Sequence, residues 1–551
     1  MSTNMPDMEA DVVIVGAGIV GSLVATRLAK TGAKVLVLEA GPRVNRAQAI
    51  ERYRDSVIKL PETPYEAVAH APAPRLDRIG DYYVQAGPDI FWSNYLRLVG
   101  GSVWHWLGMT PRLHPTDFEL KSRFGVGADW PLRYDDIEPY YVDAEHLMGV
   151  SGHGDLESPR SAPYPLPPIA LNNSDKAWER ALGTLGVKMS VNPQARNSIP
   201  HDGRPACDGR ASCLPICPTV ARFDAGVQVE RAERAGARIV ENAVAVFVEI
   251  GDDERVRGIH VRRPDGSSHI ARGRIYILAA HAIETPKLLL LSRTSARPGG
   301  VANGSDLVGR NLMDHPTQVT WALTREPHGS YRGPQSTAGV DHFRFRDFDG
   351  IDQRAHRGAF RIELRADGWT YAKGTAEFAL AELLARGIRG TKLRHELALH
   401  AHRHSAVSSL VEQLPNPDNR VTLAEDALDS FGLPRPKVHY ALSDYEKRGL
   451  AAARATHDRI YDALGITSIE HAPDYFGGGH ILGTFRMGTD PKTSVVDPHG
   501  RSHDHANLFI LGGGQMPTAG TVNPTLTISA LALYALPQIE RALADDGALQ
   551  R

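Results

Sequence analysis

The chain has 551 residues, with 62 lysines and arginines against 64 aspartates and glutamates, which gives a formal net charge of -2. This balance excludes the sustained basic field that attracts nucleic acid or anionic lipid. The longest apolar runs, at 276–280 and 288–291, fall far short of the roughly 20 residues that cross a bilayer, so the sequence predicts no membrane span of its own.

The start of the chain predicts no export signal. Residues 1–18, MSTNMPDMEADVVIVGAG, pass from polar and acidic residues directly into a predicted strand, with no basic segment ahead of an apolar one. We therefore expect any location outside the cytoplasm to come from a partner.

A nucleotide-binding motif follows. A β-branched run at 12–15 predicts a strand, a helix comes next, and a second strand, VLVLE, ends at Glu39. Gly16, Gly18 and Gly21 lie between the first strand and the helix with the spacing G-x-G-x-x-G, which is specific in this context. The glycines allow a tight turn and close approach of a pyrophosphate, and Glu39 is placed to accept from ribose hydroxyls. The motif does not separate FAD from NAD, but the lack of a second copy disfavours an enzyme with two such nucleotide sites.

All three cysteines lie in residues 204–219, RPACDGRASCLPICPT. Cys207, Cys213 and Cys217 have the spacing C-x5-C-x3-C on a loop bounded by prolines. Because iron is well held by soft thiolates, and three ligands suit a cluster with one iron missing, the loop favours a 3Fe-4S cluster. The alternatives are a zinc ion with a fourth ligand from Asp208 or a histidine, one disulfide with a thiol left over, and reduced core thiols.

The middle of the chain predicts elements that complete the first domain. Strands are expected through Val244 and Val246 and at 257–263. Residues 274–292, RIYILAAHAIETPKLLLLS, predict a buried strand, a turn of small residues and a helix opened by Pro286.

The remaining chain predicts a second domain and a return segment. Strand-like alternation mixed with basic and histidine-rich stretches marks a substrate-facing domain at 318–470, with the first domain at 1–317. At 471–551 a strand, a glycine-rich loop and a helix are expected to bring the chain back to the nucleotide. The order of elements is that of an α/β fold.

The sequence resembles the glucose-methanol-choline (GMC) family of flavin oxidoreductases from end to end. The resemblance is carried by VGAGIVG and LEAGP near the start, AAHAIETPKLLLLS, VGGSVWHWLG at 99–108, VGRNLMDHP at 308–316, HILGTFRMG at 480–488 and GTVNPTLTISALAL at 520–533. Within the family the chain is similar to the large catalytic subunits of bacterial membrane-bound glucose, fructose, gluconate and sorbitol dehydrogenases, through DWPLRYDDIEPYY, ARNSIPHDGRP, LPNPDNR and the cysteine stretch. This resemblance implies a Rossmann-like FAD-binding domain and a second, substrate-binding domain built on an antiparallel sheet.

The resemblance also implies a catalytic pair. His480 would face the flavin, and Asn523 would come from the second loop to hold the substrate hydroxyl and contact the cofactor. A neutral imidazole is a fitting acceptor for the hydroxyl proton as hydride leaves the carbon. His315 is expected to be structural.

Further cofactor contacts follow from the same resemblance. Gly100 and Gly101 would run beside the isoalloxazine, and Val244 would contact FAD. His105 lies between two tryptophans in the sequence, and two roles stay open for it. It either links FAD covalently, as a histidine in this loop does in some relatives, or serves as simple packing.

The resemblance strengthens the cluster prediction, because the similar dehydrogenases bind a 3Fe-4S cluster through cysteines at this spacing. Those relatives often have a doubled first cysteine, where this chain has Asp208. The implied partners are a sugar or polyol substrate, a small chaperone subunit that carries the export signal, and a multihaem cytochrome c subunit. The expected location is the periplasmic face of the inner membrane, with the cytoplasm as the alternative.

The sequence therefore predicts an FAD-dependent dehydrogenase that oxidises a sugar or polyol by hydride transfer to flavin and passes electrons through the cluster to a cytochrome c. One alternative is a pyranose-oxidase-like or glycoside oxidase that uses oxygen. The other is a non-catalytic binding protein on a flavin fold.

Overall fold

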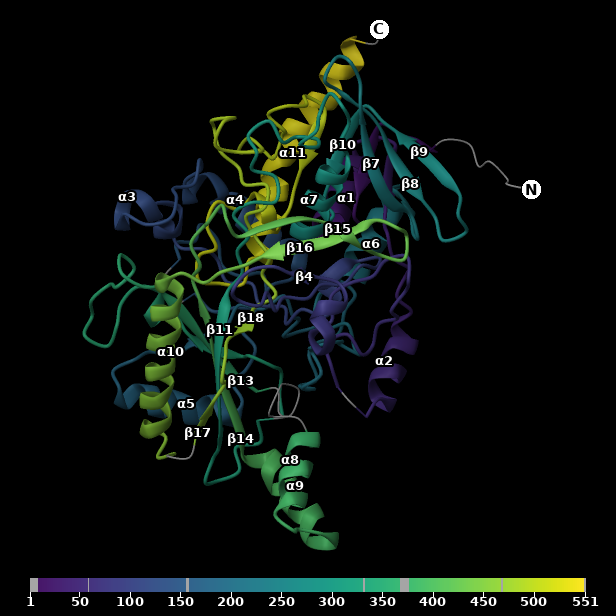
Figure 1. Ribbon diagram of the computed structural model, residues 1–551. Helices are drawn as coiled ribbons and strands as arrows, with labels where there is room; N and C mark the ends of the chain where they lie inside the picture. Colours follow the sequence, from purple (N-terminus) through teal and green to yellow (C-terminus); the bar gives the residue numbers. More distant parts are fainter. Residues whose placement is uncertain are drawn as a thin grey trace.

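The computed structural model describes residues 8–57, 59–154, 158–330, 332–366, 376–466 and 469–549, and their strands form four sheets. Figure 1 shows a parallel sheet with its helices in the upper half and a large antiparallel sheet in the lower half. The N-terminal segment, whose sequence predicts no export signal, includes residues 1–7, which lie outside the described residues.

The nucleotide sheet is parallel, with the strand order β19-β10-β2-β3-β6. Its members are β2 (Val12–Val15), β3 (Val35–Leu38), β6 (Arg238–Val240), β10 (Ile275–Leu278) and β19 (Leu508–Ile510). The three central strands are buried along their whole length, which explains their unbroken apolar sequences, since helices or sheets cover both faces. Strand β19 brings the C-terminal part of the chain back to this sheet.

Helices and a smaller sheet surround the nucleotide sheet. The helices are α1 (Ile19–Lys30), α4 (Tyr134–Met148), α6 (Ala225–Arg234), α7 (His281–Leu291) and α11 (Thr525–Leu549). Helix α1 packs against α6 and α11, and α11 packs against α4. The smaller sheet has the order β1-β9-β8-β7 and consists of β1 (Met8–Glu9), β7 (Val244–Ile250), β8 (Val256–Arg262) and β9 (Ser268–Arg272).

Helix α7 differs from the sequence-based expectation. It begins at His281, five residues before Pro286, so the prediction that Pro286 opens the helix is wrong. Proline has no N–H to donate to the carbonyl of Ala282, four residues back. The hydroxyl of Thr484 donates to that carbonyl at 2.6 Å, which allows the proline inside the helix.

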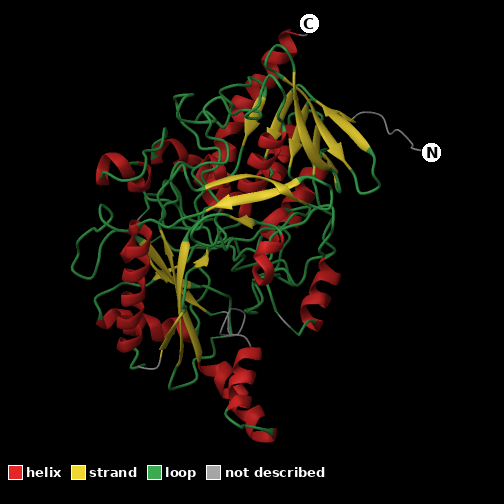
Figure 2. Ribbon diagram, viewed as in Figure 1, coloured by secondary structure: helices red, strands yellow, loops and turns green. Residues whose placement is uncertain are grey.

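The antiparallel sheet has the order β17-β11-β14-β13-β12-β5, with β18 paired beside β11. Its strands are β5 (Ser190–Val191), β11 (Pro316–Leu323), β12 (Ala338–Val340), β13 (Phe360–Arg365), β14 (His404–Val411), β17 (Ile469–His471) and β18 (Phe476–Gly477). Helices α5 (Asn173–Thr184) and α10 (Asp444–Ala463) cover one face and share a core with its apolar residues (Figure 2). The opposite face is left for the cavity described below.

A three-stranded sheet lies between these two halves. It joins β15 (Arg420–Leu428) and β16 (Pro434–His439) to β4 (Val84–Gln85) from the N-terminal region. Two further helices, α2 (Arg46–Asp55) and α3 (Leu120–Phe124), lie outside the sheets.

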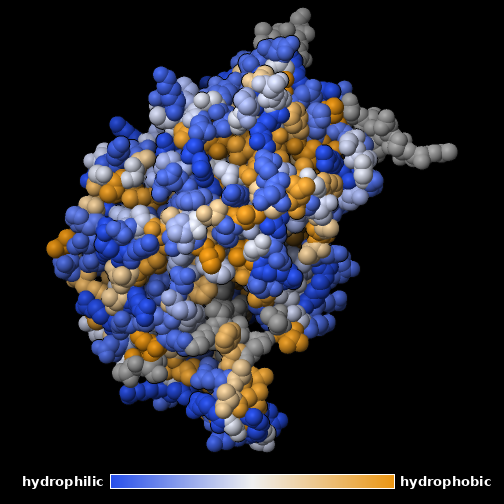
Figure 3. Space-filling model, in the orientation of Figure 1, coloured by the Kyte–Doolittle hydropathy of each residue, from blue (hydrophilic) through white to orange (hydrophobic). Residues whose placement is uncertain are grey.

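A helical hairpin projects from the antiparallel sheet. It consists of α8 (Ala376–Ala385) and α9 (Gly390–Arg403). Hydrophilic residues cover most of the face seen in Figure 3, while apolar side chains lie along one side of this hairpin, where Phe378 is 53% exposed. Among the described helices, none is long and apolar enough to cross a membrane.

The arrangement confirms the predicted fold class. A Rossmann-like parallel sheet carries the glycine-rich turn, and a separate antiparallel sheet faces it. The edge between them is where the candidate site forms.

Candidate active site

A cavity of about 780 Å³ lies between the nucleotide sheet and the antiparallel sheet. Gly16, Gly18 and Glu39 line this cavity, and so do His480 and Asn523. One space therefore joins the predicted nucleotide site to the predicted catalytic pair.

At the glycine-rich turn the wall of the cavity consists of backbone atoms without side chains. Gly16 has a φ of +101°, and a Cβ atom there would lie 2.5 Å from the carbonyl oxygen of Ala279. A Cβ atom on Gly21 would lie 1.9 Å from the Gly16 oxygen, so the start of α1 approaches the turn as only glycine allows. This geometry fits a pyrophosphate at the N-terminus of α1.

Glu39 follows β3 and lies beside the same turn. Its carboxylate accepts hydrogen bonds from the backbone N–H of Ala17 at 2.8 Å and of Gly41 at 3.1 Å. Burial raises the pKa of Glu39, and these two bonds oppose that rise. Each carboxylate oxygen keeps a second lone pair, so the residue fits an acceptor for ribose hydroxyls.

The loop with the double glycine packs on the nucleotide turn. The N–H of Gly100 donates to the carbonyl of Ala17 at 3.0 Å, and a Cβ atom on Gly101 would lie 3.3 Å from Gly18. Val244 lines the same cavity at the start of β7. The chain thus packs the double-glycine loop against the nucleotide turn and places Val244 on the same cavity.

His105 lies on the wall of the cavity. The indole N–H groups of Trp104 and Trp106 donate to backbone carbonyls, both at 2.8 Å, whereas Nδ1 of His105 has no hydrogen-bond partner among the described residues. Burial lowers the pKa of His105 to about 3, with further contributions from Arg222 and His281. The side chain is therefore a neutral, unpartnered imidazole that faces the space for the cofactor.

His480 and Asn523 meet although 43 positions separate them. The amide nitrogen of Asn523 lies 3.3 Å from Nε2 of His480, and both residues line the cavity. The structure thus brings the predicted catalytic pair together on the wall of the cavity that Glu39 also lines.

Hydrogen bonds fix which nitrogen of His480 carries the proton. The carbonyl of Gly520 can only accept, so Nε2 of His315 donates to it at 3.1 Å. A neutral His315 then has its lone pair on Nδ1, and the proton in the 3.0 Å contact between the two rings belongs to Nδ1 of His480. Nε2 of His480 keeps a lone pair, which faces Asn523.

Both rings are neutral at neutral pH. Burial lowers the pKa of His315 to about 4. Burial, and then the neighbouring His315, hold the pKa of His480 well below its usual value. The pair therefore presents an unprotonated nitrogen to the cavity.

Asp314 ties the loops of the two histidines together. One of its carboxylate oxygens accepts from the backbone N–H of His315 at 2.7 Å and of His480 at 2.8 Å, while Ser93 donates its hydroxyl to the other. Sequence reasoning missed Asp314 and expected only a structural role for His315. The one available signal was their place in the MDHP stretch, since the contact with His480 spans 165 positions.

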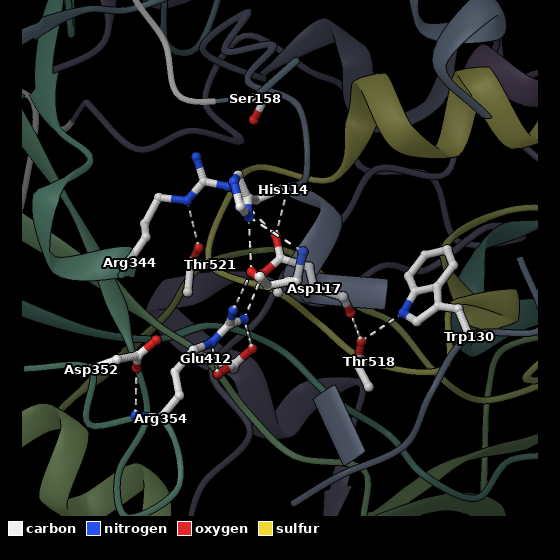
Figure 4. Close-up of polar contacts among 12 residues, drawn as sticks. His114, Asp117, Trp130, Ser158, Arg344, Asp352, Arg354, Glu412, Thr518 and Thr521 are labelled. Carbon is white, nitrogen blue, oxygen red and sulfur yellow. Dashed lines mark hydrogen bonds and ion pairs between the residues drawn. The ribbon is translucent and has the colours of Figure 1, made fainter. Parts of the chain in front are cut away.

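A buried ionic network supports the loop that carries Asn523 (Figure 4). Arg354 contacts Asp117 and Glu412, each at 2.5 Å, and Arg344 donates to the hydroxyl of Thr521 at 2.9 Å. Arg344 also lies 3.5 Å from Asp117, so one carboxylate serves both arginines. The network fixes the backbone two residues before Asn523.

The cysteine loop adjoins the cofactor end of the cavity. Cys213 and Cys217 are buried and Cys207 is half-buried. Arg222 donates to the carbonyls of Cys213 and Trp104, which joins this loop to the one that carries His105. Leu214, next to Cys213, lines the cavity itself.

The distances between the three sulfur atoms are relevant to the kind of metal centre that they would bind. In the described chain, the only group of three or more metal-binding side chains with ligand atoms all within 4.8 Å of one another is Asp314, His315 and His480. The three sulfur atoms do not form such a group in the described chain. A cluster, in which each thiolate would bind a different iron, does not require the three sulfur atoms to lie so close together.

His281 is a cavity residue that sequence reasoning missed. It has a φ of +77°, which is rare for a residue other than glycine, and its ring stacks on Tyr95 with a centroid distance of 4.2 Å. Its Nδ1 has no hydrogen-bond partner in the part of the chain that the structure describes. The sequence has no signal that a histidine occupies this backbone conformation.

Comparison with known proteins identifies the family of the chain. Residues 121–317 and 415–532 match two family models described as GMC oxidoreductase, and residues 11–52 match one described as FAD dependent oxidoreductase. The chain is 38% identical to the fructose dehydrogenase large subunit of Gluconobacter japonicus, over 97% of this chain and 98% of that one. It is 29% identical to the 2-methyl-1,2-propanediol dehydrogenase of Mycolicibacterium austroafricanum (98% and 96%) and 30% identical to the 6'''-hydroxyparomomycin C oxidase of Streptomyces lividus (98% and 92%).

Solved structures share the fold. A formate oxidase superposes with a TM-score of 0.67 at 17% identity, covering 98% of this chain and 100% of that one. The pyridoxine 4-oxidase of Mesorbium loti superposes with a TM-score of 0.64 at 18% identity, covering 96% and 99%. The glycine-rich turn, the paired loops of His480 and Asn523 and the family matches lead to one conclusion: the chain belongs to the GMC oxidoreductase family of FAD-dependent enzymes.

Proposed function

We propose that this chain is an FAD-dependent dehydrogenase that oxidises a hydroxyl group of a sugar or polyol and passes the electrons through a 3Fe-4S cluster to a cytochrome c partner. The observation that carries the proposal is the unprotonated Nε2 of His480 beside the Asn523 amide, in one cavity with the nucleotide turn. The dehydrogenases among the relatives support the substrate class.

The side chains at the cavity end define the proton chemistry. A substrate hydroxyl that enters between His480 and Asn523 donates to Nε2 of His480 and accepts from the Asn523 amide. FAD, when bound, accepts hydride from the alcohol carbon. Nε2 of His480 takes the hydroxyl proton at the same time, and its Nδ1–H remains bonded to His315, which holds the ring in place. Asn523 orients the oxygen without titrating.

Cys207, Cys213 and Cys217 would hold the cluster, which carries one electron at a time. Leu214 lines the cavity and directly follows Cys213 in the chain. Arg222 donates hydrogen bonds to both the cysteine loop and the His105 loop. This short path supports the cysteine loop as the outlet for electrons. Cys207 is the most exposed of the three thiols, so a partner would approach from its side.

We further infer an assembly with other subunits. The relative from Gluconobacter japonicus is named a large subunit, which supports a multi-subunit complex for this chain as well. The proposed members are a small chaperone subunit with an export signal and a multihaem cytochrome c. The proposed location is the periplasmic face of the inner membrane.

A second candidate function is an oxidase that delivers the electrons to oxygen. Its support is the presence of an oxidase among relatives of at least 30% identity. Under that alternative the cysteine loop would have no part in turnover. A non-catalytic role is disfavoured, because it gives no reason for an unprotonated histidine opposite Asn523.

The test is a substrate panel on anaerobically purified protein, combined with a visible spectrum and an iron count. We expect a flavin spectrum, iron bound to the protein, and dye reduction by sugars or polyols with little hydrogen peroxide in air. Peroxide formed in step with substrate would favour the oxidase. An apoprotein that binds NAD and ignores FAD would contradict both candidates.

A further inference from the structure

One face of the antiparallel sheet forms a wall of the cavity. Glu363 on β13 lies directly opposite Ser408 on β14, and Ser408 lies opposite Val319 on β11. All three line the cavity, whereas the alternate residues Ile362 and Val407 belong to the core beneath α10. The two-residue period of a strand thus aims Glu363 and Ser408 at the substrate space.

Each of these two side chains is buried and has an oxygen atom without a hydrogen-bond partner in the described chain. Glu363 is 3% exposed and Ser408 is 1% exposed. Neither Oε1 of Glu363 nor the Ser408 hydroxyl has a hydrogen-bond partner among the described residues. An unpaired buried carboxylate oxygen is costly, and opposite side chains on paired strands are about 5 Å apart, so both can bind one ligand.

Aromatic side chains border the same wall. Trp321, on β11, lines the cavity and contacts Phe476 with a ring-centroid distance of 6.4 Å. Trp92 also lines the cavity, and its indole N–H has no acceptor in the described chain. A cavity lined by both polar and aromatic side chains matches a sugar, which has hydroxyls at its edge and C–H groups on its face.

We propose that Glu363 and Ser408 form a recognition subsite for hydroxyls of the substrate away from the reacting carbon, and that this subsite selects neutral sugars and polyols. The inference rests on the proposed function and names its substrate class. Glu363 repels a sugar acid, because two carboxylates would meet in a space with little water. Arg365 lies two residues along the same face of β13, so a charged group of either sign meets one like charge in this space, whereas a neutral sugar meets none.

Equilibrium binding tests the subsite without turnover. Isothermal titration of the dithionite-reduced holoenzyme measures Kd for D-fructose, D-glucose, D-sorbitol, D-gluconate and D-glucosamine. The variants are Glu363→Gln, which keeps the volume, and Ser408→Ala. Glu425→Gln is the matched control, because Glu425 is 61% exposed and pairs with Arg293 on the surface. Deoxy analogues of the tightest ligand, each lacking one hydroxyl, complete a double-mutant cycle.

We expect Glu363→Gln to raise Kd for neutral sugars by roughly 10- to 100-fold, the usual worth of a hydrogen bond to a charged group, and the control to leave it unchanged. For the analogue that lacks the recognised hydroxyl, the variant and the wild type should bind alike. Bound FAD and the flavin spectrum should be the same in all variants.

Three results would overturn the subsite. They are equal affinities of Glu363→Gln and the wild type, tighter wild-type binding of D-gluconate or D-glucosamine than of any neutral sugar, and no binding of a neutral sugar at all. Failure of the proposed function looks different. Neutral sugars would then bind with the expected dependence on Glu363 but would not bleach the flavin of the oxidised enzyme.

Discussion

Nδ1 of His480 lies 3.0 Å from Nδ1 of His315, and the carbonyl of Gly520 accepts from the far side of the second ring. These two hydrogen bonds, from His315 to the carbonyl and from His480 to His315, leave the lone pair of His480 on Nε2. A substrate hydroxyl would enter beside that nitrogen. The position of a backbone carbonyl 40 residues away thereby sets which nitrogen can act as a base.

The role of His315 can be tested by replacing its acceptor nitrogen. We expect His315→Leu to slow anaerobic flavin reduction by roughly tenfold or more, because His480 loses the group that fixes its tautomer. His315→Asn offers an amide oxygen near the position of Nδ1 and should recover part of the rate. Stopped-flow reduction of the flavin over a range of pH measures both variants.

His457 supplies the control for this test. It is buried and bonded to Thr320 and Ser409, and it is not among the residues that line the cavity. His457→Gln should lower stability and leave flavin reduction unchanged. Equal rates for the Leu and Asn variants of His315 would show that the ring only fills space.

Serine at Cys207, Cys213 or Cys217 should remove bound iron, because a neutral hydroxyl is a much poorer iron ligand than a thiolate. Substrate should still bleach the flavin, since His480 and Asn523 are unchanged. Reduction of a haem protein should fall sharply. Iron analysis and low-temperature EPR of the oxidised protein, before and after substitution, measure the change.

Wild-type protein purified without oxygen provides the reference for the cysteine variants. If it contains neither iron nor an EPR signal, the cluster assignment is wrong. If all three variants turn over normally with oxygen, the oxidase is the correct function.

The buried arginine network should contribute strongly to stability. Arg354→Met leaves Asp117 and Glu412 without their shared cation, and we expect a loss of about 3–5 kcal/mol in the free energy of unfolding. Arg257→Met, which breaks a surface pair with Asp253, should cost under about 1 kcal/mol. Urea unfolding of both holoenzymes compares them, and similar losses would refute the role of the network.

Buried neutral histidines should make the protein sensitive to acid. Burial lowers the pKa of several of them to about 3 or 4, namely His105, His114, His281, His315 and His457. As pH falls below about 6.5 the unfolded chain takes up protons that the native histidines do not, so stability decreases until the native pKa is reached. His457→Gln should remove about 2 kcal/mol of the stability lost between pH 7.5 and pH 5.

The pH test compares unfolding free energies of the wild type and His457→Gln at both pH values. An equal loss in the two proteins would mean that His457 is protonated in the native state. Proton uptake on unfolding at about pH 5, measured by calorimetry in two buffers, provides an independent check.

Local motifs were readable from the sequence because their partners are close along the chain. Gly16, Gly21 and Glu39 lie within one strand-turn-helix-strand unit, so their spacing predicts their contacts. The sequence predicted an antiparallel sheet but not which strands pair in it, since the strands come from residues as far apart as 190 and 477. The division into three segments at 317 and 470 stays a prediction.

Contacts between distant segments could not be read in this way. Asp314 and His315 meet His480 through pairing of two loops, and Glu363 meets Ser408 through a strand register. Neither pairing has a periodic signal in the sequence. Pro286 shows that a local preference can also mislead. Proline favours the start of a helix, but here it lies inside one, where Thr484 donates a hydrogen bond to the carbonyl of Ala282.

The most direct test of the central claim is the rate of anaerobic flavin reduction by the best substrate in the wild type and in His480→Ala. We expect the variant to bind FAD normally and to reduce it about 100-fold more slowly or worse, since a positioned proton acceptor contributes that much. A near-normal rate in His480→Ala, with FAD fully bound, would contradict the assignment of His480 as the base.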